Sequence, residues 1–401
     1  MYPVGEKDPK DDGSLPTMEK CIVEICEQLS EYWSEFLTDS YGSHVMRTLL
    51  NILSGEQLTN DTDIRSEKSK QYNKHFQNIA SSNHKACRYT PPSFATALQV
   101  IVKSVSEYLE KINLKVLALH PIANPMLQIL IGIPGSGDTL IRNLLTGADS
   151  VDFVNTLTQD KVGSHLLEKI IETSESETFK ILYKTHFKHR ILELFQDNIG
   201  NFVLQKVIKH LHSEKQLKQV MAVLSESYSK MLYESRSGIL IQILESAANY
   251  PDCQSVLMSA LISCLNCAED DRIHELCYLI LYRFKWDKLQ VKWNIPSPSV
   301  PGSLILQKLL LFSSENVRVL TDSIAKVPKE TLMIWIKDQV CSRFVESLLT
   351  SATVSKKSKR DLVALLSGSF AELADNKFAS HVLDKCWLSS NMEFKVIFAL
   401  I

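Results

Sequence analysis

A short pattern recurs along the chain, and its spacing constrains the fold more than any other feature. Clear copies lie at 40–50, 161–171, 198–208, 300–310, 339–349 and 377–387, with weaker copies at 121–131 and 235–244. The small residues that open the copies are Gly42, Ala123, Gly163, Gly200, Gly238, Gly302, Cys341 and Ala379. Most successive copies share one near-constant spacing, and the exceptions are the longer gaps from Gly42 to Ala123 and from Gly238 to Gly302. A repeat of roughly 40 residues indicates an array of units with two or three helices each.

Each copy has the periodicity of a helix with one buried side. Counted from the small residue, positions three, four, seven and eight are mostly apolar, as in Leu166, Leu167, Ile170 and Ile171. Positions one and five are four residues apart, so we expect them to share the opposite, exposed face. An aspartate stands three residues before the small residue in four copies, where it can cap the helix start: Asp39, Asp160, Asp197 and Asp338.

The expected exposed face carries a repeated choice of polar side chains. Position one is serine or asparagine, position two is often a ring or planar group, and position five is a long hydrogen-bonding side chain. In the copy at 235–244 the register is ambiguous, with Gln242 or Ile243 at position five. We expect that copy to have an aliphatic position two and to contribute no specific contact.

At these residues the chain resembles the Pumilio (PUF) family of RNA-binding repeats. Ser-His-Leu-Leu-Glu-Lys at 164–169, Asn-Phe-Val-Leu-Gln-Lys at 201–206 and Ser-Arg-Phe-Val-Glu at 342–346 are similar to the recognition helices of that family. Because of its irregular gaps, the chain is most similar to the nucleolar branch of that family, the Pumilio-like nucleolar protein nine group. The resemblance implies an all-α fold, an α-solenoid of three-helix repeats that forms a curved array with RNA on its concave face and one base at each repeat.

The resemblance also assigns roles to the repeated positions. Base edges would be contacted by Ser43, Arg47, Asn124, Gln128, Ser164, Glu168, Asn201, Gln205, Ser303, Gln307, Ser342, Glu346, Ser380 and Asp384. Bases would stack on His44, His165, Phe202, Arg343 and His381, because planar groups offer a surface to a base. Phosphates would be contacted by Lys169, Lys206, Lys308 and Lys385, for which a solvated helix position is the alternative.

The chemistry of these pairs predicts a partial RNA sequence. Asparagine with glutamine suits uracil, serine with glutamate suits guanine, serine with glutamine suits adenine, and arginine suits cytosine. By resemblance the RNA runs antiparallel to the repeats, so the copies at 198–208, 161–171 and 121–131 would recognise 5′-UGU-3′. The first copy would favour C downstream, and the last three would favour A, G and G upstream.

The remaining segments suggest how the array is divided. Residues 1–15 are polar and expected to be disordered, and residues 16–401 are expected to form an array of at least eight repeats. Inserts are expected at about 55–92 and 264–299, and the apolar run at 276–284 could be a degenerate helix. The basic run at 356–360 could be a nuclear import signal, an RNA backbone contact or a solvated loop between helices.

Composition and local motifs argue against several other functions. The net charge is −2, the nine cysteines show no disulfide framework, and no apolar run of membrane-spanning length appears. We therefore expect a soluble protein in a reducing compartment, a monomer with no membrane contact. The glycine-rich segment 132–139 has Asp138 where a phosphate-binding loop needs lysine, and Cys264 and Cys267 lack a common zinc spacing. No enzyme, cofactor or metal site is expected.

The resemblance implies a nuclear, nucleolar protein that binds small-subunit ribosomal RNA precursor and acts in its maturation, with pre-ribosomal proteins as possible partners. One alternative is a cytoplasmic regulator of messenger RNA, which would favour a regular eight-repeat code without inserts. The other is a helical protein-interaction scaffold that does not bind RNA.

Overall fold

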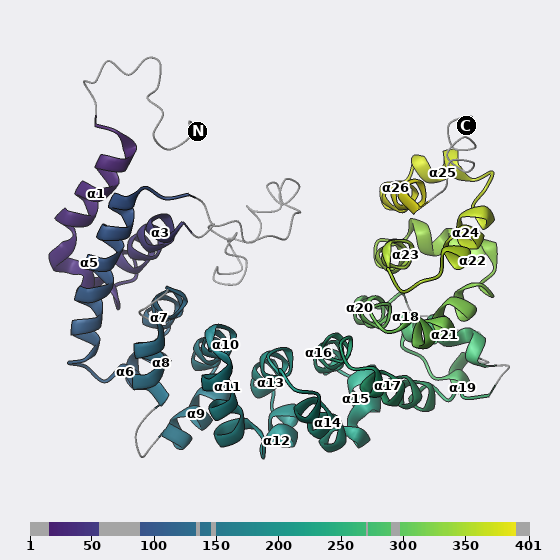
Figure 1. Ribbon diagram of the computed structural model, residues 1–401, viewed down its shortest axis with the longest axis horizontal. Helices are drawn as coiled ribbons and strands as arrows, with labels where there is room; N and C mark the ends of the chain where they lie inside the picture. The colour runs from purple at the N-terminus through teal and green to yellow at the C-terminus, as the bar shows by residue number, and fades with distance from the viewer. Residues whose placement is uncertain are drawn as a thin grey trace. The chain divides into compact units, whose positions relative to one another are not determined.

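The computed structural model describes residues 16–55, 89–133, 137–145, 150–269, 272–289 and 297–389, and every regular element in these ranges is a helix. The prediction of an all-α repeat fold is confirmed (Figure 1). The N-terminal segment 1–15 and most of the first insert lie outside the described residues, so the predictions made for them stay predictions.

The helices group into eight triplets, which divide into two compact units, Met1–His186 and Phe187–Ile401. Unit 1 contains three complete triplets: α1 (Met18–Gln28), α2 (Trp33–Phe36) and α3 (Gly42–Ser54); α5 (Pro92–Leu109), α6 (Leu114–Leu119) and α7 (Ala123–Gly132); α8 (Gly137–Leu145), α9 (Ser150–Gln159) and α10 (Gly163–Thr173). The fourth triplet begins there with α11 (Ser176–Leu182), which runs into a π-helical turn, Tyr183–Phe187.

Unit 2 completes the fourth triplet and adds four more. Its helices are α12 (Ile191–Gln196) and α13 (Gly200–Lys209); α14 (Glu214–Val223), α15 (Tyr228–Tyr233) and α16 (Ser237–Ala247); α17 (Pro251–Cys264), α18 (Leu276–Tyr282) and α20 (Val300–Leu309), with α19 (Trp286–Leu289) between the last two; α21 (Ser314–Ile324), α22 (Lys329–Lys337) and α23 (Cys341–Thr350); α24 (Lys356–Leu365), α25 (Phe370–Ala374) and α26 (Ala379–Ser389).

The triplets account for both irregular gaps in the sequence. The gap from Gly42 to Ala123 holds the insert between α3 and α5 followed by the start of one repeat. The gap from Gly238 to Gly302 holds one repeat whose middle helix is α18, Leu276–Tyr282. The stretch expected as an insert at about 264–299 therefore contains part of a regular triplet, with α19 as the extra helix. Neither gap hides a further triplet within the described residues.

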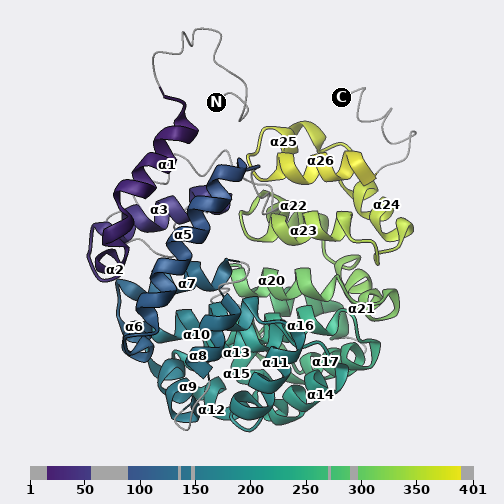
Figure 2. The ribbon, with the colours of Figure 1, turned by 60° about the vertical axis from the view of Figure 1, so that its left-hand side comes forward.

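Within each unit, the third helix of a triplet packs on the third helices beside it and contributes to the core. In unit 2, α13, α16, α20, α23 and α26 lie side by side in that order, and in unit 1 α7 packs on both α3 and α10 (Figures 1 and 2). The predicted apolar stripe is buried: Leu166, Leu167, Ile170 and Ile171 are all fully inaccessible to solvent. Removal of this apolar surface from water holds each repeat against the next.

A repeated turn fixes the start of these helices. The carboxylate of Asp197 accepts hydrogen bonds from the backbone N–H groups of Ile199 (2.8 Å) and Gly200 (2.6 Å). The other three predicted aspartates make the same pair of bonds, so the capping prediction is confirmed: Asp39, Asp160 and Asp338. Sequence analysis missed two equivalents, the Asn376 side chain and the Nδ1 atom of His120, which accept the same two bonds.

Candidate RNA interface

Position one of the repeated helix is buried, which corrects the exposed face expected from the sequence. The exposed fraction is between 1% and 3% for six of the seven assigned side chains, namely Ser43, Asn124, Ser164, Asn201, Ser303 and Ser342, while Ser380 is half-buried. Six of the seven side chains donate to backbone carbonyl oxygens, namely those of Asn124, Ser164, Asn201, Ser303, Ser342 and Ser380. Asn201, for example, donates from Nδ2 to the carbonyl oxygens of Asp197 (3.1 Å) and Asn198 (2.7 Å).

In three helices the side chain at position one also accepts a hydrogen bond from the side chain at position five. The Nε2 group of Gln205 donates to Oδ1 of Asn201 at 3.3 Å, and that of Gln128 donates to Oδ1 of Asn124 at 2.7 Å. In α20 the Nε2 group of Gln307 donates to the hydroxyl of Ser303 at 3.1 Å. Each glutamine is half-buried and keeps a carbonyl oxygen that can accept a hydrogen bond from a base edge.

Position two is exposed at every assigned stacking residue. Phe202 is 55% exposed, and His44, His165, Arg343 and His381 are also exposed. These groups lie close to position five of the same helix. A nitrogen of Arg47 lies 2.9 Å from Nδ1 of His44, Nδ1 of His165 lies 3.8 Å from a Glu168 oxygen, and a nitrogen of Arg343 lies 3.7 Å from a Glu346 oxygen.

In α13 the structure joins the three predicted residues into one arrangement, and α7 and α20 repeat the bond between positions one and five. A buried position one orients a half-buried position five beside an exposed position two. Such a face offers a hydrogen-bonding group and a planar surface to one flat, polar ligand group per repeat. Pro125 and Leu304 occupy position two in α7 and α20 and offer less planar surface.

The fifth repeat departs from this arrangement, and both registers considered from the sequence are wrong. The burial pattern of α16 matches that of α13 only when Ser237 is position one, Gly238 is position two and Ile241 is position five. Arg236 therefore replaces the small opening residue. Its guanidinium donates to the carbonyl oxygens of Phe195 (2.9 Å) and Gln196 (3.0 Å) in the turn of the preceding repeat.

Glycine at position two of α16 leaves room for the glutamine of the neighbouring helix. A Cβ atom on Gly238 would lie 2.5 Å from Oε1 of Gln205. The α16 face therefore has neither a planar group at position two nor a hydrogen-bonding group at position five. The prediction that this repeat contributes no specific contact is unchanged, although its residues are different.

The lysines assigned to phosphate differ in their surroundings. Nζ of Lys308 lies 2.9 Å from a Glu245 oxygen on α16, and its side chain is only 25% exposed. Lys169, Lys206 and Lys385 are half-buried. The basic run at 356–360 is not a loop, because it forms the first turn of α24, capped by the hydroxyl of Ser355, which accepts from the N–H group of Ser358 at 3.0 Å.

Two other candidate motifs carry no site within the described residues. Residues 134–136 of the glycine-rich segment are outside them, and Gly137 and Asp138 begin α8. Burial raises the pKa of Cys267 to about 11, and its thiol contacts the carbonyl oxygen of Ile262 at 3.6 Å. No group of three or more potential metal ligands occurs in the part of the chain that is described.

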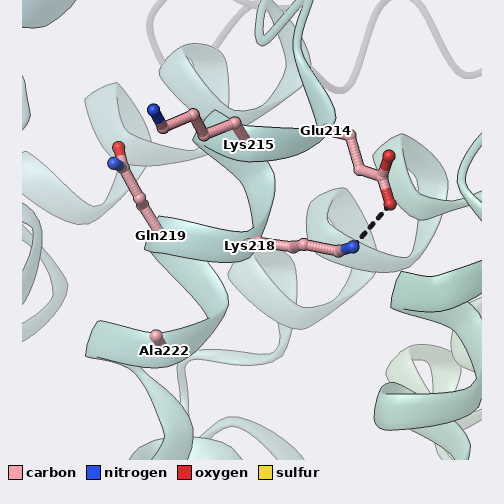
Figure 3. Close-up of a pocket in the computed structure, with 5 residues that line it drawn as sticks. All are labelled: Glu214, Lys215, Lys218, Gln219 and Ala222. Carbon is pink, nitrogen blue, oxygen red and sulfur yellow. Dashed lines mark ion pairs between the residues drawn. The ribbon is translucent and has the colours of Figure 1, made fainter.

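A shallow hollow of about 410 Å³ lies on α14 (Figure 3). It is lined by Glu214, Lys215, Lys218, Gln219 and Ala222. Its central cation is already neutralised, since Nζ of Lys218 lies 2.9 Å from a Glu214 oxygen and 3.0 Å from an Asp252 oxygen. It contains none of the repeated positions.

The sequence and the fold were compared with known proteins. Residues 4–399 match the family described as the NOP9-like PUF repeat domain. Proteins named Nucleolar protein 9 are similar over most of the chain: that of Ajellomyces dermatitidis is 27% identical over 95% of this chain and 59% of its own length, and that of Paracoccidioides brasiliensis (strain Pb03) is 28% identical over 94% and 58%. The chain thus spans less than two thirds of these relatives.

Solved structures share the fold. The structure of APUM23-GGAGUUGACGG has a TM-score of 0.73 and 21% identity, over 97% of this chain and 73% of that one. The Puf3 RNA-binding domain bound to site A of the Cox17 RNA has a TM-score of 0.51 and 17% identity, over 93% and 89%. No described helix combines the length and the apolar character needed to cross a bilayer. From its repeated helices to its match over nearly the whole sequence, this chain belongs to the NOP9-like PUF repeat family, a non-enzymatic family of RNA-binding repeats.

Proposed function

We propose that the chain binds single-stranded RNA on the third helices of its repeats, and that its target is the small-subunit ribosomal RNA precursor in the nucleolus. The observation that carries the proposal is the hydrogen bond between a buried position one and a half-buried position five in α13 and in α20 of unit 2, each beside an exposed position two. A polar face on a helix that serves only solubility does not need a buried hydrogen-bonded residue behind each exposed one.

The order of these pairs in unit 2 gives a specific RNA sequence. Taken from α26 back to α13, the pairs favour G (Ser380/Asp384), G (Ser342/Glu346), A (Ser303/Gln307), no base at α16, and U (Asn201/Gln205). Antiparallel binding then predicts 5′-GGANU-3′, where N is any base.

The RNA sequences in the APUM23 structures support this order. They are GGAAUUGACGG, GGAGUUGACGG and GGAUUUGACGG, which share GGA and the fifth base U and differ only at the fourth base. The variable base falls where the fifth repeat of this chain lacks a hydrogen-bonding side chain. The UGU predicted from α13, α10 and α7 does not occur in those RNAs, so the agreement is confined to unit 2.

The nucleolar role is supported by the family and by the relatives' name, Nucleolar protein 9. Cross-linking of the chain to RNA in cells, followed by sequencing, tests it. Cross-links concentrated on the small-subunit precursor are expected, whereas cross-links concentrated on messenger RNAs would favour the regulator alternative.

Selection of random RNA on the purified chain tests the base preferences. GGANU is expected to enrich on the native chain, and Asn201→Ala/Gln205→Ala is expected to lose the preference for U at the fifth base alone. A matched control is Gln216→Ala/Gln219→Ala on α14, which should behave as the native chain. Enrichment of no RNA would favour the scaffold alternative.

A further inference from the structure

A second basic site lies beside the C-terminal end of α26. A hollow of about 600 Å³ is bounded by α24, by the end of α23 and by the end of α26. Lys356, Lys359 and Arg360 line it from α24, Lys385 lines it from α26, and Thr350 and Ser389 add hydroxyl groups. Figure 2 shows α24 beside one end of α26. The described residues that line it include no carboxylate.

Within the described part of the chain, these cations have no acidic partner. None of Lys356, Lys359, Arg360 and Lys385 lies within 4.0 Å of a carboxylate oxygen of a described residue, in contrast to Lys218 and Lys308. Lys359 is held in place by a hydrogen bond from Nζ to the carbonyl oxygen of Ser351 at 2.6 Å. Its ammonium group is partly removed from water, and this burial lowers the pKa of Lys359.

The position of the cations disfavours a purely structural role. Lys356, Lys359 and Arg360 lie within the first five residues of α24, together with Lys357, and this helix has no acidic residue in its first turn. The N-terminal end of a helix dipole is positive, so basic side chains there lower helix stability, whereas a bound anion would raise it. The site therefore suits a ligand with several negative charges.

RNA phosphates fit this site because it adjoins the row of base-contacting helices. Lys385 directly follows Asp384, which is position five of α26. Binding of residues 356–360 as a linear import signal would require α24 to unwind, since this segment is helical and capped.

We propose that this hollow binds the phosphate backbone of RNA that continues past the base at α26, without contacting its bases. The site rests on the proposed function, because it extends the same RNA. With the antiparallel orientation, the bound segment lies 5′ of GGANU. It adds affinity that depends on salt and not on sequence.

The test compares three RNAs on the full chain: GGAGUUGACGG alone, the same RNA with a 5′ oligouridine tract, and the same RNA with a 3′ tract. The variant is Lys356→Gln/Lys359→Gln/Arg360→Gln. The control is Lys215→Gln/Lys230→Gln/Lys326→Gln, which removes the same charge from exposed positions elsewhere in unit 2.

The native chain and the control are expected to bind the 5′-extended RNA about tenfold more tightly than the core RNA. The variant should bind the core as the native chain does but lose the gain from the 5′ tract. For the 5′-extended RNA, the slope of log affinity against log salt should be smaller in magnitude by about 2 for the variant than for the native chain. Each of the three lost phosphate contacts to a single strand contributes about 0.7. A circular dichroism melt checks that the variant is folded.

Other outcomes overturn the inference in distinguishable ways. Equal affinity of the native chain for the core and the 5′-extended RNA would remove the second site and leave the proposed function intact. If the variant lost affinity only for the 3′-extended RNA, the placement of the bound phosphates on the 5′ side of GGANU would be wrong. Binding of an import receptor that depends on the same residues, without a change in RNA affinity, would assign the cluster to a protein. Failure to bind any of the RNAs would overturn the proposed function as well.

Discussion

At the residue scale, one aspartate per turn links the sequence pattern to the position of the RNA-facing side chains. Asp197 satisfies two backbone N–H groups that the first turn of α13 cannot pair internally. The carbonyl oxygen of the same residue accepts from the side chain of Asn201. The turn therefore fixes both the start of the helix and its position-one side chain.

Replacing Asp197 should cost stability. Asp197→Ala is expected to lower the free energy of unfolding by about 1 kcal/mol, because two N–H groups lose their acceptor. Urea unfolding followed by circular dichroism measures the change. Asp197→Asn keeps an acceptor oxygen and should lose less, and Asp252→Ala, at an exposed surface ion pair, should change stability by less than about 0.5 kcal/mol. Equal losses in all three would contradict a capping role.

At the element scale, α16 shows where sequence reasoning reached its limit. The capping aspartates and the apolar stripe depend on local spacing, so both could be predicted. The register of α16 could not, because Gly238 looks like the small opening residue of the other copies. In the folded chain Arg236 takes that place by bonding to Phe195 and Gln196 of the preceding repeat, a contact between residues far apart in the sequence.

Gly238 should matter for RNA and not for folding. In Gly238→Ala the new Cβ would displace the Gln205 carboxamide, the flexible end of a side chain, while alanine favours the helix by about 1 kcal/mol. The variant is expected to melt at the native temperature or above it. In selection it should show a weaker preference for U at the fifth base. A lower melting temperature with an unchanged preference would refute this account of Gly238.

Position five of α16 should be convertible into a base contact. Ile241→Gln places a carboxamide beside Ser237 and so reproduces the Ser303/Gln307 pair of α20. Selection on this variant is expected to enrich A at the fourth base, where the native chain shows no preference. The control Ile334→Gln changes an exposed isoleucine on α22 and should leave the fourth base unselected. If the Ile241→Gln variant still shows no preference at the fourth base, the fourth base does not lie at α16.

At the scale of the whole molecule, the all-α repeat fold could be predicted, while the number of repeats in the two long gaps, the burial of position one and the hollow at α24 could not. Helical periodicity assigns a residue to a face but does not show that Asn201 turns back onto its own turn. The hollow forms where α24 lies against the end of α26. The spacing of residues along the sequence does not predict that contact.

The buried thiols and phenols of unit 2 make stability depend on alkaline pH. Burial raises the pKa of Cys277 and Cys386 to about 12 each, and it raises those of Tyr228 and Tyr282 to about 12. In the unfolded chain a thiol titrates near about 8.5 and a phenol near about 10. Between these values the unfolded state releases protons that the folded state retains, so rising pH favours unfolding.

The free energy of unfolding should therefore be insensitive to these groups below about pH 8 and should fall progressively between about pH 8.5 and 12. Each fully ionised unfolded thiol contributes a slope of about 1.4 kcal/mol per pH unit. Cys277→Ala/Cys386→Ala is expected to be less stable at neutral pH, because it leaves cavities, yet its stability should fall less steeply above about pH 8.5. Urea titrations at a series of pH values measure both curves. Parallel curves above about pH 8.5 would show that these two thiols are not protected by the fold, and would place them in segments that open before the unit unfolds.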